Sequence, residues 1–196
     1  MSLEFEGKDR LIKRIDAAID GECPFEITTC LRRALVECIA DPGIRLPDEV
    51  FEVIPGHYAR REVYTSPDKG YSMIAMTWGP GQGTPIHDHA GMWCVECVYQ
   101  GVIDVESFEP SGGDPKQGDE VEFTPVGEEH ASVGMAGALI PPSEYHLIRN
   151  GGEGKAVTIH VYGGEMCACN CYEELDSGKY RRANKSLSYD STPCIA

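Results

Sequence analysis

The stretch Trp78-Gly-Pro-Gly-Gln-Gly-Thr-Pro-Ile-His-Asp-His89 decides the fold that we expect of this chain. It ends in two histidines, His87 and His89, that are separated by one residue. Residues i and i+2 of a β-strand point to the same face, so both imidazoles can reach one metal ion while Asp88 faces away. The sequence therefore predicts a strand over residues 84–89 that carries two metal ligands.

The residues around these histidines form a longer motif. From its first glycine the pattern reads Gly81-x5-His87-x-His89-x4-Cys94-x6-Gly101. It resembles the first motif of the cupin superfamily, in which most metal-binding members have a Glu at the position of Cys94.

A second motif follows later in the chain and reads Pro141-x-Ser143-x2-His146-x3-Asn150. It resembles the second cupin motif, with Ser143 where that superfamily usually has a Gly. Together the two resemblances imply a mainly β fold, a cupin (double-stranded β-helix or jelly-roll) barrel, in which His146 is the third metal ligand.

The absent Glu has a chemical consequence. Three neutral imidazoles leave a divalent ion with its full charge and with open positions, whereas a carboxylate would neutralise part of that charge. Such a site can hold an anionic substrate group and O2 together. Imidazole suits iron, zinc, copper and nickel alike, so the ligands alone leave the metal open.

The chain resembles one cupin family more narrowly, the cysteine dioxygenase family of thiol dioxygenases, in which three histidines hold iron(II) and a Cys replaces the Glu. Cys94 stands where mammalian-type members have the Cys that is joined to a tyrosine by a thioether bond. That tyrosine ends a Ser-x-His-x-Tyr strand, to which Thr158-Ile-His-Val-Tyr162 is similar. The resemblance implies Fe(2+) as the cofactor and Cys94, Thr158, His160 and Tyr162 as catalytic residues.

Alternation in a strand gives the same residues a physical role. Thr158, His160 and Tyr162 share one face of the strand predicted over 155–162. We expect their hydroxyl, imidazole and phenol groups to form one hydrogen-bonded row that fixes the orientation of the tyrosine.

A further match lies upstream, where Tyr58-Ala-Arg60 resembles the family's Tyr-x-Arg. The resemblance covers roughly residues 45–165 and implies that Arg60, beside Tyr58, binds the substrate carboxylate. A planar guanidinium can give a carboxylate two parallel charge-assisted bonds. In a strand, Arg61 would lie on the opposite face.

The resemblance implies an iron(II)-dependent reaction that adds both atoms of O2 to a small carboxylated thiol and yields the sulfinate. L-cysteine is the first expected substrate, because Arg60 and Cys94 match the cysteine-specific pattern; 3-mercaptopropionate or mercaptosuccinate is the alternative. Two functions of other classes stay open: a cupin isomerase or hydrolase that uses zinc or manganese, and a non-catalytic, metal-dependent small-molecule sensor. The absent Glu weighs against the first, and the lack of a DNA-binding segment weighs against the second.

Composition excludes some partners. A formal net charge of −15 argues against nucleic acid and against an anionic membrane, because both require a basic face. No apolar run is long enough to span a membrane, and no signal-peptide pattern begins the chain. Nine cysteines without such a signal predict reduced thiols in the cytoplasm. We expect a monomer or small homo-oligomer that binds a thiol and O2.

Two smaller groups of residues carry weaker signals. Cys167, Cys169 and Cys171 alternate, but they lack the second pair of ligands that a zinc site requires. His130 follows two glutamates and is expected to be exposed rather than a ligand. Residues 187–189 are expected to fold back over the mouth of the pocket, as C-terminal segments do in bacterial relatives.

The length of 196 residues predicts a single domain, with a helical segment (1–45), a barrel (46–165) and a C-terminal extension (166–196). Apolar residues at helical spacing predict one helix that ends at Gly21 and another over 25–40, both packed outside the barrel. The predicted strands are 58–65, 71–78, 84–89, 93–99, 101–108, 118–123, 129–134, 137–140, 145–149 and 155–162.

Overall fold

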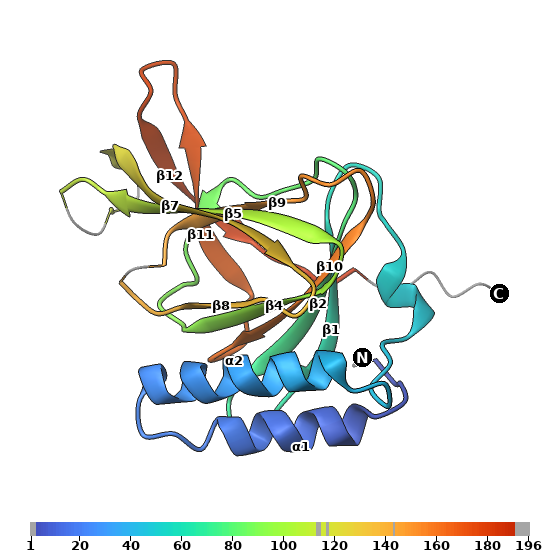
Figure 1. Cartoon of the computed structure of the whole chain (residues 1–196). Coiled ribbons are helices and arrows are strands. Elements are labelled where there is room, and N and C mark those ends of the chain that lie inside the picture. Colours follow the sequence, from blue (N-terminus) through green and yellow to red (C-terminus); the bar gives the residue numbers. More distant parts are fainter. Residues whose placement is uncertain (1–2, 113–114, 117, 143, 191–196) are drawn as a thin grey trace.

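Two helices lie along one side of a pair of curled β-sheets in the computed structural model (Figure 1). The structure describes residues 3–112, 115–116, 118–142 and 144–190. The helices are α1 (Lys8–Ala18) and α2 (Pro24–Ala40), and each buries one stripe of residues. The buried residues are Leu11, Ile15, Ala18, Thr28, Leu31, Leu35 and Cys38. A turn of 3-10 helix, η1 (Asp48–Phe51), leads into the sheets.

The sheet next to the helices has five antiparallel strands in the order β1-β2-β10-β4-β8. Its strands are β1 (Ala59–Thr65), β2 (Ser72–Trp78), β10 (Ala156–Tyr162), β4 (Cys94–Gln100) and β8 (Ala136–Leu139). Every residue of β2 and β10 is buried. Helix α2 contacts β4 and β8, so the helices cover the outer face of this sheet.

The second sheet has seven antiparallel strands in the order β6-β12-β11-β3-β9-β5-β7. Its strands are β6 (Glu120–Val121), β12 (Tyr180–Ser186), β11 (Ala168–Glu174), β3 (Ile86–His87), β9 (His146–Arg149), β5 (Val102–Pro110) and β7 (Phe123–Ser132). The central strands β3 and β9 are short, with two and four residues.

Strand β10 shows how one sequence pattern serves two faces. Val157, Ile159 and Val161 belong to the core cluster that also contains the buried residues of the helices. Because side chains alternate along a strand, Thr158, His160 and Tyr162 point the opposite way, into the barrel. A row of polar groups is therefore buried in the barrel interior by the same strand that anchors the helices.

The glycine that ends the first motif has a clear structural reason. Gly101 joins β4 to β5 with a φ of 78°. A Cβ at this position would lie 2.7 Å from the carbonyl oxygen of Lys155. Both the left-handed backbone and the close approach require glycine at this turn.

The predicted mainly β fold, with two helices outside the barrel, is confirmed. Three details of the prediction were wrong. The strand predicted over 84–89 is only Ile86–His87. The strand predicted over 129–134 begins at Phe123 instead, because Pro125 lies beside a bulge on an edge strand, where a missing N–H is tolerated. Strands β11 and β12 were not predicted.

The division of the chain into segments 1–45, 46–165 and 166–196 stays a prediction, although residues 168–186 of the last segment provide strands to the second sheet. Ser143 of the second motif lies outside the described residues. Within the described part of the chain, no helix has the length and apolar character that crossing a membrane requires.

Candidate metal centre and active site

The three predicted metal ligands lie together. His87 and His146 face each other across β3 and β9, and His89 follows two residues after His87. One ligand atom from each ring lies within 4.8 Å of the other two. The sequence predicted that His89 is on a strand. In the structure it lies in the turn after β3. The turn, rather than strand alternation, directs its ring toward the other two.

Hydrogen bonds determine which nitrogen of each ring is free. Nδ1 of His87 lies 3.2 Å from the carbonyl oxygen of Pro85, and Nδ1 of His146 lies 3.2 Å from that of Glu144. A carbonyl only accepts, so each Nδ1 carries the proton and each Nε2 keeps its lone pair. Nε2 of His146 is buried without a partner among the described residues. A buried acceptor of this kind fits a metal ion.

The protonation states fit as well. Burial lowers the pKa of His87 to about 3, and the neighbouring His89 contributes to this shift. Burial, with His87 and His89, also lowers the pKa of His146 well below its usual value. Neutral imidazole is the form that binds a metal, so both rings are in the binding form at neutral pH.

A carboxylate that the sequence analysis did not identify stands behind the third ligand. Glu144 Oε2 lies 3.3 Å from His89 Nδ1 and accepts a hydrogen bond from the backbone N–H of His89 at 3.1 Å. The Glu144 side chain is only 8% exposed. A carboxylate at the far nitrogen of a ligating histidine fixes its tautomer and raises its basicity.

Asp88, between the two histidines, points away from the metal ligands, as predicted. Its carboxylate accepts hydrogen bonds from the backbone N–H and the side-chain amide of Asn170, at 2.9 and 2.7 Å. Asn170 is on β11, so this contact ties the metal-binding turn to a strand that was not predicted. His130 is exposed, and its Nδ1 lies 2.5 Å from Asp104 Oδ1, so it does not belong to the histidine cluster.

The predicted polar row on β10 is only partly continuous. The indole N–H of Trp78 donates to Thr158 Oγ1 at 2.9 Å, and Thr158 Oγ1 lies 2.8 Å from His160 Nε2. His160 and Tyr162, both described residues, are not hydrogen-bonded to each other; their rings stack with centroids 6.0 Å apart. The expected single row is therefore wrong at its last step, because the two rings lie nearly parallel, at an interplanar angle of 15°, and stack instead of pointing polar atoms at each other.

Tyr162 has a different partner. It lies directly opposite Cys94 in the register of β10 and β4, where side chains of antiparallel strands are in contact. A hydrogen bond from Tyr162 lowers the pKa of Cys94, but burial outweighs it and raises that pKa well above the usual value. Burial likewise raises the pKa of Tyr162. Both groups are protonated and adjacent at neutral pH.

Arg60 is buried and points into the same interior. Its guanidinium donates to the carbonyl oxygens of Ser188 and Met166, each at 3.2 Å. Two bonds use only part of its five N–H donors, and it makes no ion pair with any described residue. Arg61 takes the opposite side, as predicted, and donates to the carbonyl oxygens of Val50 and Glu52.

Arg60, Tyr58, His87, His160 and Tyr162 line one small cavity of about 30 Å³. The ring of Tyr58 stacks on Trp78 with centroids 4.4 Å apart and so forms a flat wall. Thus the structure brings Tyr58, Arg60 and Tyr162 to one pocket with His87, one of the three predicted metal ligands.

The C-terminal segment closes this pocket, as predicted. Leu187 lines it, the Tyr189 ring lies 5.5 Å from the Arg60 guanidinium, and Asp190 accepts from the Arg60 backbone N–H at 2.8 Å. Three lining residues with titratable side chains were not predicted as part of the site: Cys169, Cys171 and Lys185. Alternation of the two cysteines could have placed them on one face; their sulfurs lie 3.8 Å apart.

Comparison with known proteins gives one family match. The family described as cysteine dioxygenase type I matches residues 52–175, more than half of the chain.

Several solved structures are also similar. A protein from Thermus thermophilus is 20% identical, with 58% of this chain and 89% of that one covered and a TM-score of 0.42. An uncharacterised conserved protein with a double-stranded β-helix domain from Klebsiella pneumoniae is 18% identical, with 61% and 88% covered and a TM-score of 0.44. An oxalate oxidase in complex with glycolate is 19% identical, with 64% and 63% covered and a TM-score of 0.43.

Proposed function

Because the chain belongs to the cysteine dioxygenase type I family, we propose that it is an iron(II)-dependent thiol dioxygenase for a small carboxylated thiol. The overall change is RSH + O2 → RSO2⁻ + H⁺. The observation that carries this proposal is the position of Arg60, a buried guanidinium without an acidic partner among the described residues, in the pocket that His87 and Tyr162 also line.

The three histidines are the proposed ligands of the iron. Bound there, iron(II) would supply the Lewis acidity and the redox chemistry that O2 addition to sulfur requires. Their ligand atoms lie within 4.8 Å of one another, and Glu144 supports His89 from behind. The donor set of imidazoles alone leaves room for the thiol and O2.

Arg60 is proposed to bind the carboxylate of the substrate. Its unused N–H groups can form paired, charge-assisted hydrogen bonds, which are stronger in a pocket that excludes water. The Tyr58 ring, held against Trp78, limits the substrate's movement on one side. Holding both reactants in one orientation lowers the barrier by reducing the entropy lost in the reaction step.

Tyr162 is proposed to keep its own proton at the phenol oxygen and to act from there as a hydrogen-bond donor to the substrate. Burial and Cys94 keep this phenol protonated at neutral pH, so it can donate a hydrogen bond to a charge that forms on the substrate. His160, which is neutral because burial lowers its pKa to about 3, is proposed to hold the tyrosine ring in place by stacking, and Thr158 to orient His160.

The identity of the thiol depends on what else lines the pocket. L-cysteine is the substrate that the resemblance predicts. However, none of the described residues that line the pocket is Asp or Glu, whereas Lys185 adds a second cation. An ammonium group would find no anion among them, so the lining favours 3-mercaptopropionate or mercaptosuccinate, the second of which has another carboxylate for Lys185.

The test is oxygen uptake by protein loaded anaerobically with iron(II), across L-cysteine, 3-mercaptopropionate, mercaptosuccinate and cysteamine, with sulfinate measured alongside. We expect uptake and sulfinate in equal amounts for at least one carboxylated thiol and little with cysteamine. Zinc-loaded protein is the control and should consume no O2. Binding of thiols without O2 uptake would contradict the proposal and favour a sensor, and conversion without O2 would favour a metal-dependent isomerase or hydrolase.

A further inference from the structure

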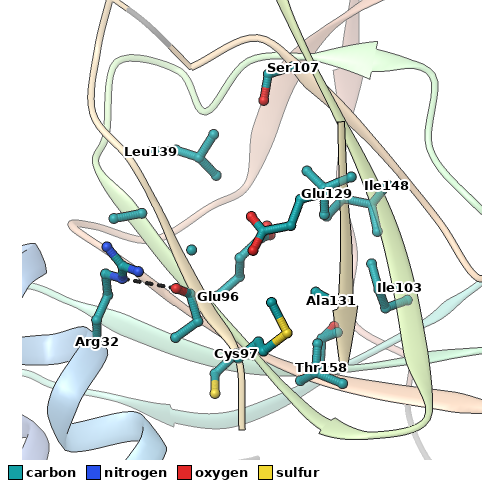
Figure 2. Close-up of a pocket in the computed structure, with 16 residues that line it drawn as sticks. Arg32, Glu96, Cys97, Ile103, Ser107, Glu129, Ala131, Leu139, Ile148 and Thr158 are labelled. Carbon is teal, nitrogen blue, oxygen red and sulfur yellow. Dashed lines mark hydrogen bonds between the residues drawn. The ribbon is translucent and has the colours of Figure 1, made fainter. Parts of the chain in front are cut away.

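A second cavity lies on the other side of the polar row. It has a volume of about 260 Å³, and its lining combines apolar with charged and polar side chains. Thr158 and Ile148 border this cavity, and Ile148 also lines the substrate pocket. Figure 2 shows Glu96 and Glu129 extending into it, with Arg32 at its edge, where the guanidinium donates to the carbonyl oxygen of Ala136 at 2.9 Å.

Glu96 reaches this cavity because of its place in β4. Cys94, Glu96 and Val98 alternate on the inner face of the strand and stand opposite Tyr162, His160 and Thr158 of β10. On its other side Glu96 stands opposite Gly137 of β8. The absence of a side chain there leaves the carboxylate open to the cavity.

The carboxylate of Glu96 is close to the far nitrogen of His160. Oε2 lies 3.5 Å from His160 Nδ1, and the two side chains are 13% and 2% exposed. Oε2 is buried and has no hydrogen-bond partner among the described residues. A buried carboxylate oxygen is costly unless a donor approaches it, and His160 is the donor within reach.

The proton of His160 is on the nitrogen that faces Glu96. The Trp78 indole can only donate, so Thr158 Oγ1 accepts from it. Because the Glu96 carboxylate faces Nδ1 and can only accept when charged, the arrangement that satisfies both ring nitrogens has the Thr158 hydroxyl donating to His160 Nε2, at 2.8 Å. Nε2 therefore accepts, and the proton of this neutral ring is on Nδ1.

We propose that Glu96 is a positioning residue for His160: its carboxylate accepts the Nδ1–H, and the second cavity lets it exchange a proton with solvent. Thr158 and Glu96 then hold the ring from opposite ends. The His160 ring stacks on that of Tyr162, and both rings line the substrate pocket. The ionisation of Glu96 therefore controls how firmly these two rings are held.

Burial and the charges around Glu96 set the pH at which its carboxylate ionises. Burial raises the pKa of Glu96 to about 7, and the negative charge of Glu129 on β7 contributes to this rise. His160 faces it from β10, Arg32 from α2 lines the same cavity, and β8 brings no titratable group. Cys94 and Cys97 on β4 have raised pKa values and stay neutral. Glu96 therefore gains its charge near neutral pH.

The variant that tests this is Glu96→Gln, which keeps the size of the side chain but removes its charge. Glu129→Gln is the matched control, because Glu129 lines the same cavity, is exposed, and touches neither substrate nor metal ligands. The first readout is the ¹⁵N shift of His160 Nδ1 in zinc-loaded protein, a diamagnetic form, between pH 5.5 and 8.5 as an approximate range around the Glu96 pKa. The second is the pH profile of kcat.

We expect the His160 shift to titrate near pH 7 in the unchanged protein, at lower pH in Glu129→Gln, and not at all in Glu96→Gln. The acid limb of kcat should follow the same three patterns, and Glu96→Gln should lower the plateau of kcat about 10- to 100-fold. Glu129→Gln should keep the plateau. A pH profile unchanged in Glu96→Gln would overturn the proposal, even if kcat fell.

If Glu96→Gln does not fold, Glu129→Gln alone tests the role of Glu96. A midpoint moved to lower pH supports the role of Glu96, and an unmoved midpoint contradicts it. The kinetic measurement rests on the proposed function, whereas the ¹⁵N measurement does not. Protein that oxidises no thiol but shows the expected His160 titration would therefore contradict the proposed function and support the role of Glu96.

Discussion

The two sheets build the active site in opposite ways. The five-stranded sheet provides Arg60 from β1, Cys94 from β4 and the polar row from β10, on strands of seven residues each. The seven-stranded sheet provides two of the three proposed metal ligands from β3 and β9, which have two and four residues. Long ladders hold side chains without help, whereas two short strands have few backbone bonds. We therefore expect the first sheet to be a preformed platform and the second to depend more on bound metal.

The largest effect expected from this difference is on metal binding. His146→Ala should lose the iron, because two imidazoles bind far more weakly than three. Metal analysis measures this, and hydrogen exchange should become faster in β3 and β9 but not in β2 and β10. His130→Ala, at an exposed histidine, is the control and should keep its iron. Full occupancy in His146→Ala would contradict the three-histidine site.

The platform can be tested at Arg60. Arg60→Ala should leave the substrate carboxylate unpaired in a pocket that excludes water, at a cost of roughly 2–5 kcal/mol, or tens- to thousands-fold in kcat/KM. The kcat/KM of Arg60→Lys should lie between those of Arg60→Ala and the unchanged protein, because an ammonium keeps the charge but not the planar pair of donors. Iron content should not change in either variant. If cysteamine were oxidised as fast as carboxylated thiols, Arg60 would not have this role.

The platform also carries a buried acid, which should make its stability depend on pH. The pKa of Glu96 is raised from 4.5 to about 7 in the fold. The folded state therefore holds this proton more tightly, so the contribution of Glu96 to stability is greatest below pH 4.5 and falls as pH rises to about 7, by up to about 3 kcal/mol.

Urea unfolding of metal-free protein measures this effect. Glu96→Gln carries no charge at any pH, so it should gain stability relative to the unchanged protein as pH rises from 5 to 8, a range set by the raised pKa of about 7. A constant difference between the two proteins over this range would show that Glu96 titrates as it does in the unfolded chain.

A smaller effect is expected behind the metal ligands. Glu144→Gln should weaken metal binding by about 10- to 100-fold, because the carboxylate beside His89 Nδ1 orients that ring and raises its basicity. Competition with a chelator measures the affinity. Glu128→Gln, an exposed acid on β7, is the control. Equal affinities in all three proteins would mean that the turn alone holds His89.

The smallest change expected is a covalent one within the platform. Cys94 and Tyr162 are directly opposite in register, so we expect a thioether in a fraction of molecules. The C–S bond would form with loss of two hydrogen atoms to the iron and O2 of turnover. Peptide mass analysis after aerobic turnover should show the lighter species, and Cys94→Ser should abolish it while keeping iron and some activity. Its absence after prolonged turnover would favour 3-mercaptopropionate or mercaptosuccinate over cysteine.

Local patterns in the sequence determined much of the fold and of the candidate site. The spacing of His87 and His89 predicted that both imidazoles reach one ion, and the resemblance of the second motif to that of the cupins added His146. Alternation along 155–162 separated the apolar face from Thr158, His160 and Tyr162, because successive side chains of a strand point to opposite sides.

Only the tertiary structure decided how these residues are supported. Glu144 reaches His89 and Glu96 reaches His160 from distant parts of the chain, and no periodicity indicates such a pairing. Strand β11 pairs with β3, and its Asn170 binds Asp88, contacts between segments that lie far apart in the sequence. The local pattern determined which face a side chain occupies, but its protonation and its partners depend on charges and burial that arise only when distant segments pack together.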